Sequence, residues 1–140
     1  MKYNLQVTEI THDELVNIFS MLYCENDFSV MYKKSLYNSI PKDKRVGDCL
    51  EDKVADCLLN GKEICVVDIQ AEGQVYGNLQ HKIDEEDESV AYFVTLQDFF
   101  NGFSNPDAID YVKDLAEGND DYWTAYNLIQ FVIFGEIIYA

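Results

Sequence analysis

The sequence predicts an α+β fold, in which a small, mainly antiparallel sheet of three to five strands carries helices on one side. Short apolar runs that have period two, or that are rich in β-branched residues, recur along the chain and indicate strands. Capping signals precede several apolar runs of helical period and mark helix starts. Hydrophobic residues make up 48% of the 140 residues and aromatic residues 14%, which suffices for the packed core of one domain, residues 1–140.

Strand patterns occur in residues 1–7, 28–32, 62–70, 75–83 and 89–94. The run KEICVVDIQ (62–70) predicts a buried strand. The turn AEGQ follows it, VYGNLQHKI (75–83) returns, and SVAYFV (89–94) adds the third strand of a meander. Five consecutive carboxylates, Asp84–Glu88, cannot belong to a core element, so they predict a loop.

Two helices are marked in the first half of the chain. Thr11 and Glu14 form a capping box, which predicts a helix from His12 to about Cys24. Its apolar face consists of Leu15, Ile18, Phe19 and Leu22. A second helix is predicted over residues 48–61, with a capping box at Asp48 and Glu51 and a C′ glycine at Gly61. Its apolar stripe consists of Cys49, Leu50, Val54, Cys57 and Leu58.

Three helices are expected in the second half. Thr95 and Asp98 open a short helix over residues 96–103. Asn105 followed by Pro106 is an N-cap with proline at the first helical position, and that helix ends near Gly118. Its buried side is expected to hold Ile109, Val112, Leu115 and Ala116. The stretch 122–139 is apolar on nearly every face, which is typical of a central core helix or of a helix in a subunit interface.

The charge is unusually negative and unevenly distributed. Ten Lys and Arg against 26 Asp and Glu give a net charge of −16. Residues 83–140 hold 13 acids and a single cation, Lys113. Direct binding to nucleic acid or to anionic lipid is disfavoured by the like charge, so the expected partner is a cationic protein surface. Five cations lie between Lys33 and Arg45, and we interpret this basic segment as local charge balance.

The first 20 residues lack the apolar region of a signal peptide, and the longest uncharged late run, residues 122–135, is shorter than a membrane span. We therefore expect a cytoplasmic protein with no membrane association. The cysteines lack the spacing of a zinc site or a redox pair, and in such a compartment they are expected to be small buried hydrophobic residues. They are Cys24, Cys49, Cys57 and Cys65.

No motif for nucleotide binding, nucleophilic catalysis or calcium binding occurs in the sequence, so we expect no enzymatic activity, no cofactor and no metal site. His12 and His81 are too few for most metal sites and are expected to be ordinary surface or half-buried residues. One acid, Asp68, lies inside an apolar strand, and a small enzyme that uses a buried carboxylate of this kind stays an open alternative. Its alternation with Val67 and Ile69 predicts that Asp68 points to the open face of the sheet.

The acids of the second half form the candidate partner-binding surface. Four of them follow one another at spacings of three, four and three residues, so they line one helical face about 4.5–6 Å apart along the axis. One DNA strand presents a charge about every 3.4 Å, so several patches would have to lie together to imitate a phosphate array. Tyr111 and Tyr122 are expected to supply apolar contacts to the partner among these charges. The candidate residues are Asp84, Glu85, Glu86, Asp87, Glu88, Asp107, Asp110, Tyr111, Asp114, Glu117, Asp120 and Asp121.

In size, acidity and aromatic content, the chain resembles small DNA-mimicking inhibitors of phages and mobile elements, of the anti-restriction and anti-CRISPR type. The stretches CLEDKVADCLLNGKEICVVD and LIQFVIFGEIIY also resemble small accessory proteins of mobile elements in gut bacteria. The first resemblance implies a non-enzymatic inhibitor that occupies the basic groove of a nuclease or another nucleic-acid-binding protein. The alternative is a structural or interaction module with a merely solvated acidic face. A homodimer formed through the C-terminal helix is one form of this alternative.

Overall fold

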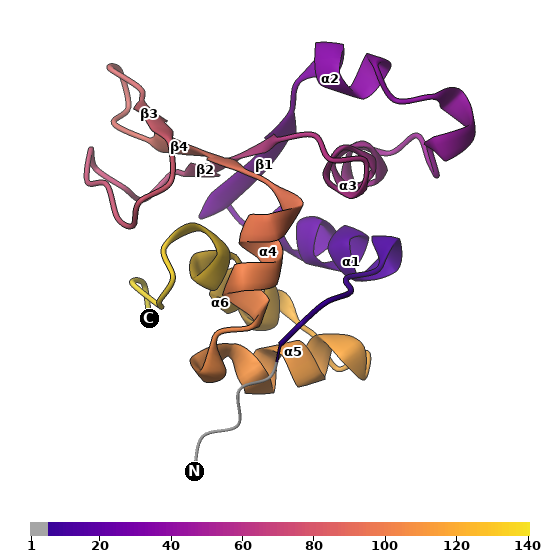
Figure 1. The fold of residues 1–140 in the computed structure, drawn as a ribbon. Coiled ribbons are helices and arrows are strands. Elements are labelled where there is room, and N and C mark those ends of the chain that lie inside the picture. The colour runs from indigo at the N-terminus through magenta and orange to yellow at the C-terminus, as the bar shows by residue number, and fades with distance from the viewer. Residues whose placement is uncertain (1–5) are drawn as a thin grey trace.

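The computed structural model describes residues 6–140 and confirms the predicted α+β class (Figure 1). Within this range, six α-helices and two 3₁₀ turns accompany one four-stranded sheet. The elements in chain order are α1 (His12–Leu22), β1 (Phe28–Tyr32), α2 (Lys34–Asn38), η1 (Lys42–Lys44), α3 (Leu50–Leu59), β2 (Ile64–Asp68), β3 (His81–Ile83), β4 (Val90–Val94), α4 (Leu96–Phe103), η2 (Pro106–Ala108), α5 (Ile109–Ala116) and α6 (Tyr122–Ile133).

The sheet is antiparallel throughout, in the order β1-β2-β4-β3. Helices α1, α3, α4 and α6 lie below it in Figure 1, and no helix covers the middle of its upper face. Strand residues two apart share a face, so the inner side of β2 and β4 is a continuous apolar surface. That inner surface consists of Ile64, Val66, Val90, Tyr92 and Val94, all buried.

The predicted meander is wrong in its order, because β4 pairs with β2 and separates it from β3. Residues 75–80 form no strand. Tyr76 instead donates its backbone N–H to the Tyr92 hydroxyl (3.0 Å), and Gly77 adopts a positive φ of 72°. A Cβ at Gly77 would lie 3.0 Å from the Ile133 carbonyl, so the segment leaves the sheet to pack against the end of α6.

Helix capping agrees with the sequence at three of the four predicted starts. The capping boxes at Thr11 and Thr95 are both present, and Asn105 accepts from the N–H of Asp107 to open η2, which α5 continues. The box predicted at Asp48 is wrong. Helix α3 begins at Leu50 without a side-chain cap, and both Cys49 and Leu50 are exposed rather than part of the apolar stripe.

The segment before α3 is held by a carboxylate in the second turn of the helix. Buried Asp56 accepts from the N–H of Val46 (3.0 Å) and so fixes the chain four residues before the helix begins. The other oxygen of Asp56 lies 3.4 Å from Nε2 of half-buried His12, and this contact links α3 to α1.

Helix α6 is the core helix that the sequence predicts, and nine of its twelve residues are buried. It ends at Ile133, however, six residues before the predicted end, because Gly135 turns the chain at a φ of 80°. The returning segment is fixed by the buried side chain of Gln130. Its Oε1 accepts from the N–H groups of Ile138 and Tyr139 (both 2.8 Å), and its Nε2 donates to the Tyr139 carbonyl (3.0 Å).

The strand predicted for residues 1–7 lies mostly outside the described residues, and its described part, Gln6 and Val7, is not in a strand. Val7 donates its N–H to the Ser104 hydroxyl (2.8 Å). That contact places the start of the described chain beside the end of α4.

Candidate interaction surfaces

The five consecutive carboxylates, hereafter the acidic hairpin (Asp84–Glu88), form the exposed turn between β3 and β4, as predicted. The turn is held by its own side chains. Asp84 accepts from the N–H groups of Glu86 (2.8 Å) and Asp87 (3.3 Å). Asp87 accepts from the N–H of Ser89 (3.0 Å), and the bonds from Ser89 lower the pKa of Asp87. The hairpin therefore presents its charge on an ordered backbone.

The acidic stripe, defined as Asp107, Asp110, Asp114 and Glu117, lies on η2, α5 and the helix C-cap. All four side chains reach solvent, although Asp114 is half-buried, and exposed Lys113 lies among them. On the opposite side only Leu115 is fully buried. Ile109 and Val112 are half-buried and Ala116 is exposed, so the predicted buried side is narrower than expected. Tyr111 is half-buried, with its ring 6.2 Å from that of Phe131.

Three aromatic rings at the start of α6, which follows the stripe in the sequence, pack together and form what we call the aromatic corner: Tyr122, Trp123 and Tyr126. Their centroids are 5.3–5.7 Å apart, and Trp123 remains 59% exposed. The Tyr122 hydroxyl donates to Asp27 in the loop before β1, and burial, followed by this carboxylate, raises the pKa of Tyr122. No local sequence pattern indicates that Trp123 and Asp27 both lie against Tyr122, so neither was among the predicted residues.

Two acids of the candidate set lie between the stripe and the aromatic corner. Asp121 is the N-cap of α6 and accepts from the N–H of Thr124 (3.0 Å), so part of its hydrogen-bonding capacity is used structurally. Asp120 is half-buried beside it. Both lie in the segment that joins α5 to α6, directly before Tyr122 and Trp123 in the sequence.

The acidic hairpin and the acidic stripe are not brought together. In Figure 1 the hairpin projects from the upper left of the molecule, whereas α5 lies at its lower end with the helical layer between them. The Debye length at physiological salt is about 8 Å, so exposed patches at opposite ends of the fold act independently. A single continuous phosphate-like array made from all twelve candidate residues is therefore not formed.

Asp68 does not point to the open face, and that prediction is wrong. It shares the inner face with Ile64 and Val66 and is fully buried. Tyr139 donates its hydroxyl to one carboxylate oxygen (2.8 Å), and the Gln70 N–H donates to the other (3.0 Å). Burial raises the pKa of Asp68, and these two bonds oppose the shift. Through the bond from Tyr139, Asp68 connects the C-terminal segment to β2.

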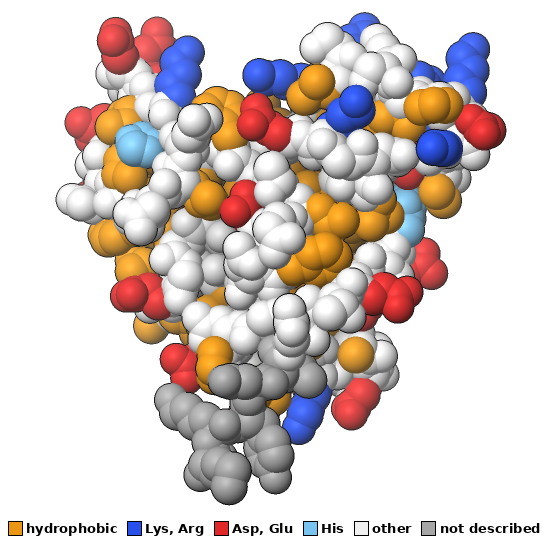
Figure 2. Space-filling model, viewed as in Figure 1, with side chains coloured by type: hydrophobic (Ala, Val, Ile, Leu, Met, Phe, Trp, Pro, Cys, Tyr) orange, Lys and Arg blue, Asp and Glu red, His pale blue; other side chains and the backbone are white. Residues whose placement is uncertain are grey.

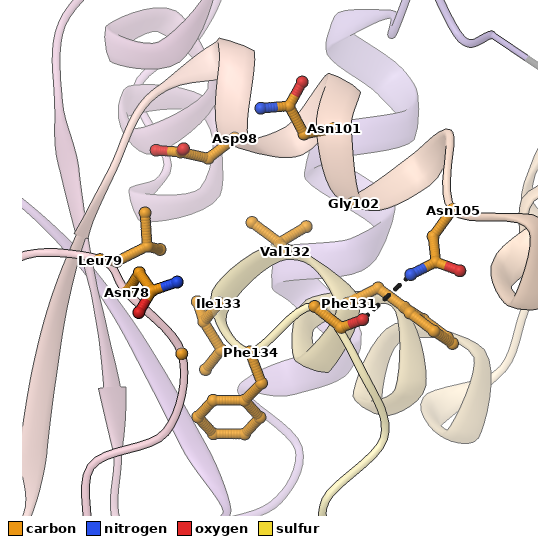
Figure 3. A pocket seen from close by; sticks show the side chains of 12 residues that line it. Asn78, Leu79, Asp98, Asn101, Gly102, Asn105, Phe131, Val132, Ile133 and Phe134 are labelled. Carbon is orange, nitrogen blue, oxygen red and sulfur yellow. Dashed lines mark hydrogen bonds between the residues drawn. The ribbon is translucent and has the colours of Figure 1, made fainter.

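Figure 3 shows a cavity of about 270 Å³ between α4, the loop at Asn78 and the end of α6. Asn105 donates to the Gly135 carbonyl across it (3.0 Å). Its single carboxylate, Asp98, already accepts from the N–H of Thr95 (2.8 Å) as part of a capping box, so the lining offers no free acid–base pair. Among residues 6–140, no group of three His, Cys, Asp or Glu side chains is placed to hold a metal ion.

None of the helices that the structure describes combines the length and the hydropathy that crossing a bilayer requires. Comparisons with protein-family models, with curated proteins and with solved structures find no match to this chain. Its surfaces are therefore interpreted from their own chemistry.

Proposed function

We propose that the protein is a non-enzymatic binding protein that recognises a cationic surface of another protein through the acidic stripe and the aromatic corner. The observation that carries this proposal is the exposure of Trp123, the one tryptophan of the chain, beside carboxylates. Tryptophan and tyrosine dominate the energetics of protein interfaces, and an indole face attracts Lys and Arg side chains. A surface that combines this ring with Asp120 and the stripe suits a partner rich in arginine or lysine.

The partner class that fits is a nucleic-acid-binding protein or a nuclease, whose basic groove the stripe would occupy in place of DNA. The stripe runs ten residues from Asp107 to Glu117, about 15 Å along the axis. That length matches about four phosphates of one DNA strand. Because the acidic hairpin lies at the other end of the molecule, the proposed mimicry is local and relies on the aromatic corner for further contact.

The role of the acidic stripe in binding is tested with two variants that each remove three negative charges. One carries D110N, D114N and E117Q, and the matched control neutralises the hairpin with E85Q, E86Q and E88Q. Binding of a nona-arginine peptide is measured by calorimetry at 50 and 150 mM salt. We expect the stripe variant to bind about tenfold or more weakly, since each exposed pair contributes up to about 1 kcal/mol, while the hairpin variant retains wild-type affinity. W123A should also weaken binding.

Equal losses in both variants would contradict the proposal, because they would show that only net charge matters and that the acidic face is merely solvated. Both variants replace side chains that reach solvent by amides of similar size, so their melting temperatures should match the wild type. The mimicry itself is tested on a basic protein captured from host lysate by the immobilised chain. A short DNA duplex should displace that protein, and retention in the presence of the duplex would argue against mimicry.

A further inference from the structure

The outer face of the sheet is apolar, although no element of the described chain covers it. Strand register aligns its side chains into two rows across the strands, Met31–Cys65–Phe93 and Ser29–Val67–Ala91–Lys82. An antiparallel sheet with one solvated face normally alternates apolar and polar residues. Here five of the seven outer positions are apolar, and Met31 is 51% exposed. Strands that are apolar on both faces are typical of sheets covered on both sides.

The face has a knob with a hollow on each side. Met31 is the knob. One hollow, of about 210 Å³, is mostly apolar and is bounded by Cys65 and Phe93. The other, of about 300 Å³, is bounded by Val67 and Ala91. In a two-fold contact the same surface meets itself, so a knob beside a hollow is self-complementary in shape.

Opposite charges flank this face on opposite sides. The acidic hairpin rises on one side, and the basic segment (residues 33–45), which includes α2 and η1, rises on the other (Figure 1). Figure 2 shows the same division, with Lys and Arg side chains crowded at the upper right and acidic side chains at the tip on the upper left. The hairpin carries five carboxylates, and the basic segment carries five cations and one acid. In a chain of net charge −16, this is a surface on which the two signs are close to balanced.

Charges of both signs also lie at the corners of this face. Lys33 lies 3.9 Å from Glu63 on the side of the basic segment, and Lys82 and Asp84 border the second hollow on the side of the hairpin. Consider a two-fold axis in the plane of the contact and perpendicular to the line from hairpin to basic segment. It places Lys33 of one copy over Asp84 of the other, and the hairpin over the basic segment. The other in-plane axis would oppose hairpin to hairpin.

We propose that two copies of this chain stack these sheet faces about such an axis to form a homodimer. The face is complementary to a second copy of itself, both in shape and in charge, which is the requirement for an isologous interface. Packed sheets lie about 10 Å apart, so the apolar side chains of the two copies would meet across the contact. The acidic stripe, at the far end of each copy, stays exposed.

The test is the mass in solution, measured by sedimentation equilibrium over a concentration series. The wild type should reach twice 16.2 kDa, and M31K should remain a monomer. Since Met31 is half exposed in the monomer, M31K should keep the wild-type circular dichroism spectrum. The matched control is I137K, an exposed apolar position in the C-terminal segment on the helical side of the sheet, which should dimerise like the wild type.

A charge exchange tests the axis itself. The Asp84 carboxylate holds the hairpin turn, so its exposed neighbour Glu85 is exchanged instead. K33E and E85K should each raise the dimer dissociation constant about tenfold, because each places like charges opposite one another. The double variant K33E/E85K should return it to within about threefold of the wild type. The proposal is overturned if the wild type is monomeric throughout, if M31K dimerises as well as I137K, or if the double variant is as weak as the single variants.

Discussion

Gln130 provides the sharpest test of how the C-terminal segment is held. It is fully buried in the most apolar helix of the chain, and its amide makes three hydrogen bonds of 2.8–3.0 Å to the backbone of residues 138 and 139. We consider the substitution Gln130→Leu, which keeps similar volume and removes these three hydrogen bonds together with a longer one from Nε2 to the Tyr126 carbonyl (3.4 Å). Each net hydrogen bond contributes about 1 kcal/mol, so the free energy of unfolding should fall by about 3 kcal/mol.

For a chain of this length, about 3 kcal/mol corresponds to a loss of roughly 10 °C in melting temperature. Urea unfolding followed by circular dichroism measures the free energy, and hydrogen exchange measures the local effect. The amides of Ile138 and Tyr139 should lose protection more than those of β2 or β4. The matched control is Asn127→Ala on the same helix, a half-buried amide without a hydrogen bond in the structure, which should change stability by less than about 0.5 kcal/mol.

If Gln130→Leu were as stable as the wild type, the segment would not depend on this side chain. A leucine can gain transfer free energy in an apolar site, which works against the predicted loss. Loss of amide protection at residues 138–139 would still occur in that case. Unchanged stability together with unchanged protection would refute the reasoning.

Three further perturbations test other parts of the fold. Gly102→Ala should destabilise by about 1–3 kcal/mol in chemical unfolding, despite the higher helix propensity of alanine, because the new Cβ would lie 2.7 Å from the backbone of α6. Burial raises the pKa of Asp68, so the folded state keeps a proton that the unfolded chain loses above about pH 3.8. The free energy of unfolding should therefore fall as the pH rises from this value through the pKa of the folded state. Asp68→Asn should reduce this pH dependence, which is measured as the urea midpoint from pH 4 to 7. Cys24 and Cys49 are exposed, whereas burial raises the pKa of Cys57 to about 11. A chromogenic disulfide reagent at pH 8 should therefore label Cys24 and Cys49 quickly and Cys57 slowly. Rapid labelling of all three cysteines would contradict this prediction.

Local features of the fold could be predicted from the sequence because they depend on neighbouring residues. The capping boxes at Thr11 and Thr95 each join residues three apart, and the C′ glycines Gly61 and Gly118 adopt positive φ where the helices end. The turn at the acidic hairpin follows from charge alone. Strand order could not be predicted in this way, because the pairing of β2 with β4 depends on contacts across more than twenty residues.

The orientation of Asp68 shows a second limit. When both faces of a strand are apolar, alternation gives two equivalent sets, and the sequence does not indicate which set faces the core. The end of α6 is a similar case, because the apolar residues Ile137 and Ile138 look like a continuation of the helix, and the turn at Gly135 decides otherwise. The sequence did not indicate the structural role of Gln130, since its hydrogen-bond partners are backbone groups of a segment predicted to be helical.

The candidate surface was predicted residue by residue but not in its arrangement. The exposure of the hairpin and of the stripe follows from their composition. Their separation depends on the whole tertiary fold, and so does the approach of Asp27 to Tyr122 that completes the aromatic corner. Sequence spacing indicates which acids share a helix face and does not indicate which patches share a side of the molecule.

The uneven distribution of charge also has a kinetic consequence. The basic segment lies at one end of the molecule and α5, which carries most of the acidic stripe, at the other (Figure 1), so the molecule has a permanent electric dipole in addition to its net charge. In dilute salt, the field of an approaching polycation would exert a torque that turns the α5 end toward it before contact. Encounters would then be oriented rather than random, which raises the association rate constant while leaving the lifetime of the complex to Trp123 and its neighbours.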